Sequence, residues 1–334
     1  MTSRADLLRV TPDDAEYRRL AAAEAEYWSS PVPFALEALE ERFSEGPVDR
    51  YTNVRFTGDR GVGWHETIAR HGPFRRGLVL GLSALRVEGR ILETNPGLHL
   101  TFLDLSEGSL ARRTDVLGAR FPGRVATRCA DLNFTELEPD AYDVIVSSSS
   151  LHHVTNLEHL AWQINAALTP DGWFFLNDYV GEPRFQFAST KRRVFEAVHD
   201  REVARTPGRR PGCNWMDASD LSPFCGVRSD EVLPVLRKHL DEAEVRTAAA
   251  LTVALMRSKP ADGATVRPPG LGRRMTDAAV RRALALFGRL PAARVPVSKQ
   301  LLDELMLTGD MLTDAGLILP GTAFATYRKR RPAD

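Results

Sequence analysis

Short apolar runs alternate with amphipathic segments through the middle of the chain. The apolar runs have the length of buried strands, and the segments between them carry apolar residues at helical spacing. Strands are expected at 78–80, 98–103, 124–131, 142–150 and 173–180. The helices that separate them are expected at 85–92, 106–121 and 157–168. Strands that alternate with helices predict an α/β fold with a Rossmann-like, doubly wound and mostly parallel sheet.

The pattern changes on both sides of this core. The first 75 residues are polar and rich in helix formers, whereas 184–223 is rich in arginine, proline and glycine and is expected to form a long ordered loop that acts as a lid. A late strand is expected near 243–247, and the last apolar run, 321–327, is expected to be the final antiparallel strand. We therefore predict four parts, namely an N-terminal helical cap (1–75), the Rossmann-like core (76–182), a lid insertion with a late core strand (183–258), and C-terminal helices at 275–290 and 299–309 with the final strand (259–334).

The first strand ends in a turn whose chemistry is that of a nucleotide-binding unit. Gly81 follows the apolar run, and Asp104 ends the next strand 23 positions later. In such units the turn lets backbone N–H groups approach the ligand, and the acid accepts hydrogen bonds from ribose hydroxyls. The motif 78–85 reads LVLGLSAL, with Ser83 and Leu85 where further glycines are usual. Because leucine in left-handed geometry costs about 1–2 kcal/mol, the sequence predicts a loop with an altered path.

These residues resemble motif I and the acidic second strand of class I S-adenosylmethionine-dependent methyltransferases, whose first turn reads close to LxLGCGTG. Two further motifs, SSSSLHHV at 147–154 and NDYVGEPRFQF at 177–187, resemble a bacterial subgroup with LHHV and EYVGP-like signatures. The resemblance implies the methyltransferase fold and S-adenosylmethionine as cofactor. The cofactor-binding residues that it implies are Gly81, Ser83, Asp104, Leu105, Asp131, Leu132, Ser147 and Ser148.

The residues after the fourth and fifth strands are the candidates for catalysis. A histidine there can act as a general base or a substrate anchor, and an acid and a phenol at a strand end suit proton abstraction. We expect the catalytic residues to be His152, His153, Asp178 and Tyr179. The paired histidines lack a third ligand at a spacing typical of zinc sites, so no metal is expected.

Composition excludes several classes of partner. Lysine plus arginine equals aspartate plus glutamate, at 44 each, so the net charge does not favour nucleic acid or an anionic membrane. The three cysteines lack redox spacing and suggest reduced thiols. The first residues form no apolar signal core, and the longest apolar run, 248–256, is too short to cross a bilayer. We expect a cytoplasmic protein.

Three functions remain open on the sequence alone. The first is a small-molecule methyltransferase, for a natural product or secondary metabolite, that acts on an O or N acceptor chiefly by proximity and alignment. The second is a methyltransferase-fold enzyme that performs cyclisation, elimination or hydrolysis instead. The third is a non-catalytic homologue that binds a partner methyltransferase. Oligomeric state is open, and a homodimer is compatible with the sequence.

Overall fold

A seven-stranded sheet forms the centre of the computed structural model, which describes residues 7–30, 47–205, 212–260 and 298–331. The strand order is β3-β2-β1-β4-β5-β9-β7. Strands β1 to β5 are parallel, and β9 is antiparallel to both β5 and β7. The strands are β1 (Arg76–Leu80), β2 (His99–Asp104), β3 (Val125–Cys129), β4 (Tyr142–Ser148), β5 (Leu168–Tyr179), β7 (Leu240–Ala248) and β9 (Thr322–Lys329). The predicted mostly parallel, Rossmann-like sheet and its antiparallel last strand are confirmed.

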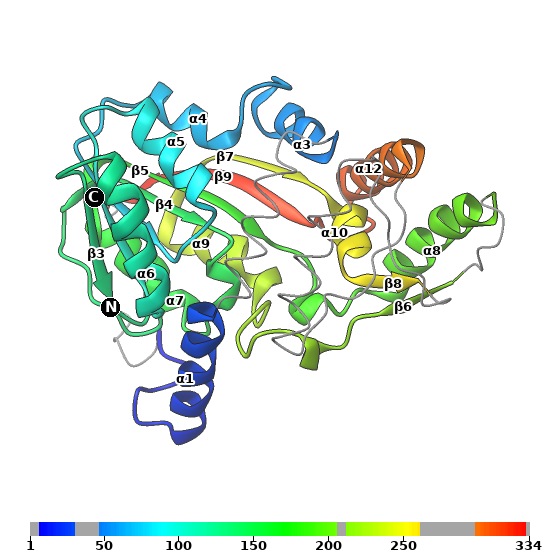
Figure 1. The fold of residues 1–334 in the computed structure, drawn as a ribbon, viewed down its shortest axis with the longest axis horizontal. Helices are drawn as coiled ribbons and strands as arrows, with labels where there is room; N and C mark the ends of the chain where they lie inside the picture. Colours follow the sequence, from blue (N-terminus) through cyan, green and yellow to red (C-terminus); the bar gives the residue numbers. More distant parts are fainter. Residues whose placement is uncertain (1–6, 31–46, 206–211, 261–297, 332–334) are drawn as a thin grey trace.

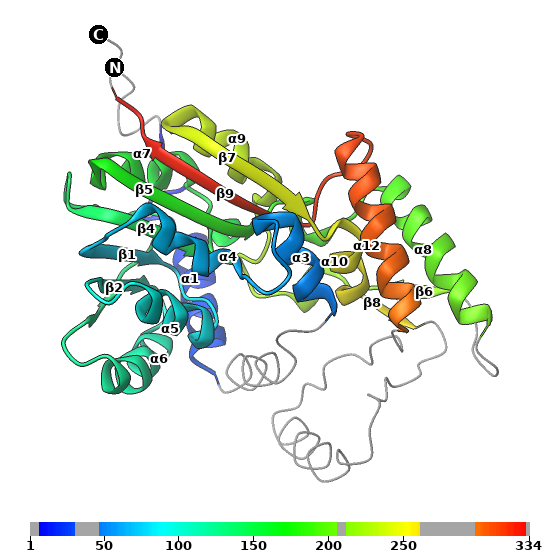
Figure 2. The ribbon, with the colours of Figure 1, turned by 90° about the horizontal axis from the view of Figure 1, so that it is seen from above.

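Helices cover both faces of the sheet, as Figure 2 shows. One face carries α7 (Leu157–Ala167) and α9 (Val232–His239), and the other carries α3 (Pro47–Thr57), α4 (Trp64–Thr67), α5 (Leu85–Thr94) and α6 (Glu107–Arg113). Neighbouring residues of a strand enter opposite cores, since successive side chains of a strand point to opposite faces. In β4, for example, Ile145 packs with α7 and α9, whereas Val144 and Val146 pack with α5. Burial on both faces explains why this strand reads as a continuous apolar run.

A third cluster lies beyond the carboxyl end of β5, on the right in Figure 1. It contains α8 (Ser189–Ala204), α10 (Ala250–Met256), α12 (Lys299–Asp314) and the short antiparallel pair β6 (Cys213–Trp215) and β8 (Ser258–Pro260). The predicted loop over 184–223 is therefore wrong over the length of α8. The buried stripe of α8 consists of Lys191, Phe195, His199 and Val203 at four-residue spacing. Because half of that stripe is polar, the helix does not appear in the hydrophobic pattern.

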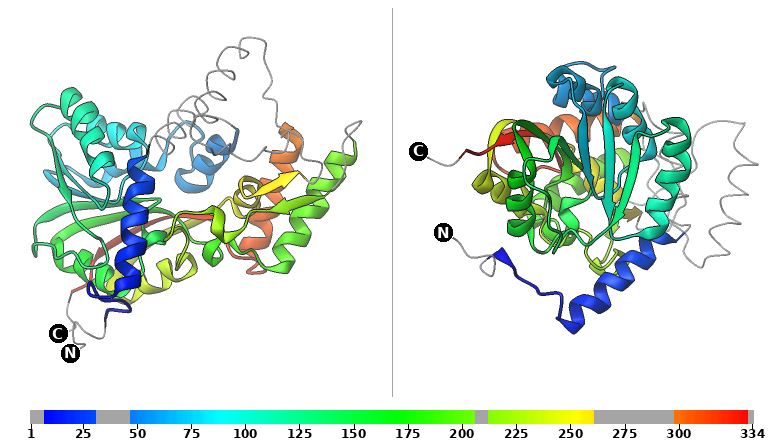
Figure 3. Two further views of the ribbon diagram at one scale, coloured as in Figure 1. Left: turned by 60° about the horizontal axis from the view of Figure 1, so that its bottom comes forward. Right: turned by 90° about the vertical axis from the view of Figure 1, so that its left-hand side faces the viewer.

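The helix α1 (Ala15–Ser29) lies apart from α3 and α4, on the opposite side of the molecule (Figures 1 and 3). Asp14 caps it by accepting hydrogen bonds from the backbone N–H groups of Glu16 and Tyr17. The remaining short helical turns are Ile68–His71, Thr114–Gly118, Leu151–His153, Pro183–Phe185, Ala218–Asp220 and Ser229–Glu231. The helix predicted at 275–290 lies outside the described residues. None of the helices in the described ranges has the length and apolarity needed to cross a bilayer.

Candidate functional site

A cavity of about 100 Å³ lies at the carboxyl ends of β1, β2, β3 and β4. This edge is where ligands bind in open, mostly parallel sheets. The sheet side of the lining comes from Gly81, Leu82, Asp104, Leu105, Ser106, Ser109, Asp131, Leu132, Asn133, Ser149, Ser150, His153 and Val154. The opposite side comes from Glu24, Ala25 and Trp28 of α1 and from Phe224.

The turn after β1 needs glycine at its first position only. Gly81 has φ +71°, and a Cβ added there would lie 2.3 Å from the side chain of Ser150. Leu85 begins α5 and is buried in the core, outside the cavity lining. Neither Ser83 nor Leu85 has a positive φ. The loop therefore follows a path without left-handed strain at these two positions.

A buried ion pair braces the same turn. Glu88 Oε2 lies 3.0 Å from Arg113 Nε, and both side chains are buried. Glu88 Oε1 accepts a hydrogen bond from the backbone N–H of Ser83 at 2.9 Å, and the Arg113 guanidinium donates to the carbonyl of Ser83. The N–H of Ser83 is thus bonded within the protein, and Ser83 does not line the cavity.

Asp104 ends β2 and borders the cavity together with Leu105. Its Oδ1 accepts a hydrogen bond from the N–H of Ser106 at 2.7 Å. Burial raises the pKa of this carboxyl. Within the described ranges, Oδ2 has no hydrogen-bond partner. One oxygen of Asp104 is therefore oriented by the backbone and the other is available to a ligand.

Asp131 also reaches the cavity but is already engaged. Its Oδ2 accepts a hydrogen bond from the Tyr17 hydroxyl at 2.7 Å, and its Oδ1 accepts from the backbone and side-chain N–H groups of Asn133. Burial, followed by the neighbouring Asp131 carboxylate, raises the pKa of Tyr17. The contact ties α1 to the segment after β3, where Leu132 contributes apolar lining.

The two serines predicted to bind the cofactor do not line the cavity. Ser147 and Ser148 are the last residues of β4 and are buried, and the Ser147 hydroxyl donates to the carbonyl of Leu80. The next two, Ser149 and Ser150, turn into the loop and line the cavity. The run of four serines gave no signal for where the strand ends.

Of the four predicted catalytic residues, only His153 lines the cavity. His152 lies behind it, with Nδ1 2.5 Å from Asp178 Oδ1. Asp178 is buried, and it also accepts hydrogen bonds from the N–H groups of Leu151 and Tyr179 at 2.7 Å each. The Tyr179 hydroxyl is directed away and donates to the carbonyl of Glu182. The structure thus brings His152, His153 and Asp178 together. The Tyr179 ring belongs to the third cluster and lies edge-on to the His152 ring, with their centroids 6.0 Å apart.

A residue that sequence reasoning missed, Glu24 of α1, holds His153. Glu24 Oε1 lies 2.8 Å from His153 Nδ1 and also accepts from Trp28 Nε1 and the Ser222 hydroxyl, while Oε2 accepts from the N–H of Phe224. Although burial opposes ionisation, these partners lower the pKa of Glu24 to about 2. Its position in an alanine- and glutamate-rich helix gives no sequence signal of this role.

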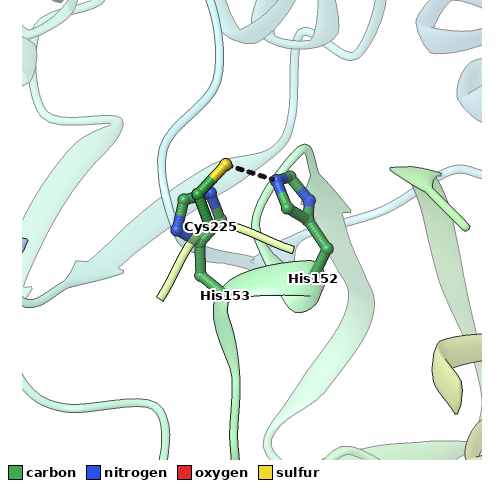
Figure 4. Close-up of side chains that lie close together, drawn as sticks. All are labelled: His152, His153 and Cys225. Carbon is green, nitrogen blue, oxygen red and sulfur yellow. Dashed lines mark hydrogen bonds between the residues drawn. The ribbon is translucent and has the colours of Figure 1, made fainter. Parts of the chain in front are cut away.

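Cys225 completes the arrangement (Figure 4). Its Sγ lies 4.0 Å from His152 Nε2, and one donor atom each of His152, His153 and Cys225 lies within 4.8 Å of the others. Burial alone would raise the pKa of the thiol, but the two imidazoles outweigh it and lower the pKa of Cys225 to about 5. Burial disfavours a charged imidazole, yet Cys225 and Glu24 raise the pKa of His153 to about 10. The third donor that the sequence lacks near the histidines is thus supplied from 72 positions beyond His153.

Comparison with known proteins agrees with this geometry. Residues 81–174 match a family model described as a methyltransferase domain. Phosphoethanolamine N-methyltransferase 2 of Caenorhabditis elegans is 24% identical over 191 residues, which are 55% of this chain and 43% of that protein. The chain therefore spans less than half the length of this curated relative.

Solved structures with a similar arrangement include methyltransferases and a cyclase. The [4+2]-cyclase SpnF is 15% identical, with 80% of each chain covered and a TM-score of 0.47. Phosphoethanolamine N-methyltransferase 2 of Haemonchus contortus in complex with S-adenosyl-L-methionine is 15% identical, with 87% of this chain and 58% of that chain covered and a TM-score of 0.44. Geranyl diphosphate C-methyltransferase from Streptomyces coelicolor is 11% identical, with 80% and 76% covered and a TM-score of 0.42.

The strand order and the family match together define the class of the core. A parallel sheet of order β3-β2-β1-β4-β5 followed by an antiparallel strand, with its cavity at the carboxyl ends of β1 to β4, is the class I methyltransferase arrangement. Residues 81–174 of this sheet match the methyltransferase-domain model, in agreement with the resemblance.

Proposed function

We propose that the protein is a small-molecule methyltransferase that transfers a methyl group from S-adenosylmethionine to an O or N acceptor. The observation that carries the proposal is the position of Asp104, a cavity-lining carboxylate at the end of β2 in a methyltransferase domain. Its Oδ2 is available to accept hydrogen bonds from ribose hydroxyls.

The residues around the cavity fit this cofactor. The absence of a side chain at Gly81 keeps the turn after β1 close to Ser150 and open to a ligand. Leu82, Leu132, Trp28 and Phe224 supply apolar surface around the polar groups, a mixture typical of cofactor sites. When bound, the cofactor supplies an activated methyl group on a sulfonium. The protein's part is to align the acceptor and exclude water.

The cavity is small compared with the roughly 300–1,000 Å³ of sites for ligands of this size. We therefore infer that α1 moves outward when ligands enter and closes over them. The contacts that hold α1 here include those of Tyr17 with Asp131, Glu24 with His153, Ser29 with Ser106, and the Ser109 hydroxyl with the Trp28 carbonyl. In this proposal α1 is the mobile cap, while α3 and α4 belong to the face of the sheet. No residue of 184–223 lines the cavity in the described part of the chain.

The acceptor would lie on the His153 side of the cavity. His153 is oriented by Glu24, so its Nδ1 is fixed and only its other nitrogen can face a reacting group. Incubation with S-adenosylmethionine and a panel of phenols, alcohols and amines tests the proposal. We expect S-adenosylhomocysteine and methylated product in equal amounts. If the protein binds the cofactor tightly but methylates none of these acceptors, the proposed function is contradicted.

A second candidate keeps the fold but abandons methyl transfer. It is favoured by the buried cluster of His152, Asp178 and Cys225 beside the cavity, since methyl transfer by alignment does not require several ionisable groups. Such a protein would convert an acceptor by cyclisation, elimination or hydrolysis with the mass of the cofactor unchanged. Mass spectrometry of substrate and cofactor after reaction separates the two candidates.

A further inference from the structure

The side chains of His152, His153 and Cys225 have the arrangement of a metal centre. They converge from two segments, the turn after β4 and the loop that precedes α9, and Figure 4 shows the sulfur of Cys225 beside both imidazole rings. We propose that these three residues bind one Zn²⁺ ion, with a fourth coordination position open toward the cavity. The site goes beyond methyl transfer and does not depend on it.

Distances between the donor atoms suit zinc. Zinc takes nitrogen ligands at about 2.0–2.1 Å and thiolate at about 2.3 Å in a tetrahedral arrangement, so its ligand atoms lie roughly 3.4–3.6 Å apart. The Sγ of Cys225 is 4.0 Å from Nε2 of His152, and all three donors lie within 4.8 Å of one another. Movements of up to roughly 0.7 Å at each side chain would bring all three donors onto one ion.

Both histidines are oriented as zinc ligands usually are. Nδ1 of His152 lies against Asp178, and Nδ1 of His153 lies against Glu24. A carboxylate behind each ring fixes the tautomer and leaves Nε2 for the metal. The carboxylates are themselves held, because Asp178 accepts from the N–H of Leu151 and Glu24 accepts from the N–H of Phe224.

The convergence of these donors is of the kind that a divalent cation binds. One ion would contact both Nε2 atoms and the sulfur at once.

A nucleophilic cysteine explains the geometry less well. A cysteine nucleophile needs one base oriented by a third group, whereas here two carboxylate-held imidazoles flank one sulfur. Cys225 is also buried and does not line the cavity, whereas His153 does. A metal ion bound by His152, His153 and Cys225 can face the cavity while the sulfur stays buried. If the proposed function holds, an acceptor heteroatom bound at the open position would lose its proton more readily.

Metal titration of the full chain tests the site. Protein stripped with a chelator is titrated with Zn²⁺ by calorimetry and with Co²⁺ by absorption spectroscopy, with metal content measured after dialysis. We expect one equivalent per chain, and a thiolate-to-cobalt charge-transfer band in the wild-type protein that reports sulfur ligation without any variant. Cys225→Ser should abolish that band and weaken Zn²⁺ binding at least 100-fold, while the matched control Cys213→Ser should leave both unchanged.

The carboxylates provide a second readout. Glu24→Gln should weaken Zn²⁺ binding about 10- to 100-fold without loss of the charge-transfer band, as expected for a group that orients a ligand. A folded wild-type protein that takes up no metal, or that binds Co²⁺ without a thiolate band, would overturn the site. Metal binding without methyl transfer would instead refute the proposed function and leave the metal site standing. Methyl transfer by a wild-type protein that takes up no metal would refute the metal site alone.

Discussion

Glu24 in the N-terminal helix lies 2.8 Å from Nδ1 of His153 in the turn after β4, although the two are 129 positions apart in the sequence. The same carboxylate receives the N–H of Phe224 at 2.9 Å. Three segments thus meet at one buried group, and α1 is attached to the cavity through it. A substitution of Glu24 should therefore weaken the attachment of α1 to the sheet.

Replacement of Glu24 should loosen α1 more than the rest of the protein. Glu24→Ala leaves a buried imidazole and a buried N–H group without their acceptor, which typically costs about 3–5 kcal/mol when a buried charged partner is lost. We expect faster amide exchange in α1 with little change in β1, β4 and β5. Glu26→Ala, an exposed change on the same helix, is the matched control. Equal exchange in both variants would show that α1 is held by other contacts.

The buried pair of Glu88 and Arg113 should matter for stability because it braces the turn after β1. Arg113→Met leaves a buried carboxylate beside Ser83 and should lower the free energy of unfolding by about 3–5 kcal/mol. The control is Arg120→Met, which breaks an exposed pair with Glu93 and should cost less than about 1 kcal/mol. Urea denaturation measures both. Similar midpoints for the two variants would refute the bracing role.

The free energy of unfolding should decrease as the pH is lowered, because of His65. Burial, the largest effect, lowers the pKa of His65 to about 4 from its usual value near 6.5. The unfolded chain therefore gains a proton below about pH 6.5, whereas the folded chain gains it only near pH 4. Stability that is complete above pH 6.5 is lost as the pH falls toward 4, by roughly 3 kcal/mol for this shift.

Comparison of variants isolates that contribution from other titrating groups. The difference in unfolding free energy between pH 7 and pH 4 should shrink in His65→Gln. It should stay unchanged in His99→Gln, where the ring is exposed. If both variants show the same difference in unfolding free energy between pH 7 and pH 4 as the wild type, the assignment to His65 is contradicted.

The central sheet could be predicted because its physical signals are local. Strands such as β4 are buried on both faces and read as apolar runs, and the turn at Gly81 carries the glycine that its left-handed φ requires. The helix α8 was not predicted, because its buried stripe includes Lys191, whose charge is compensated by Glu182 at 2.7 Å. Such a pairing becomes visible only when the chain is folded.

The site was predictable only where it follows the strands. Asp104 ends β2, Asp131 and His153 follow β3 and β4 within five positions, and all three line the cavity. Glu24 and Cys225 come from distant segments, and no motif of fixed spacing links them to the strand ends. The local sequence therefore does not predict their place in the site. Leu85 stands at a position where glycine is usual in the motif. Its side chain nevertheless points into the core and not into the ligand space, because α5 begins at this residue and sets the direction of the side chain. The strain expected there from the motif is absent.

For this reason the glycine replacement at position 85 should not improve the site. Leu85→Gly removes a buried side chain and should destabilise the protein by about 2–5 kcal/mol through the cavity that it leaves. We expect the affinity for S-adenosylhomocysteine at a temperature well below unfolding to change less than threefold. Thermal unfolding and calorimetry measure the two effects separately. A large gain in affinity would mean that Leu85 does occupy ligand space.

The most direct test of the account is calorimetric titration of the wild-type protein and Asp104→Ala with S-adenosylhomocysteine. We expect saturable binding of one ligand per chain to the wild type. Loss of hydrogen bonds to a charged acceptor costs about 1.5–3 kcal/mol each, so Asp104→Ala should bind at least tenfold more weakly. Asp143→Asn, on the opposite edge of the sheet, should bind as the wild type does. A folded wild-type protein that shows no binding at millimolar ligand, or an Asp104→Ala variant with unchanged affinity, would contradict the account.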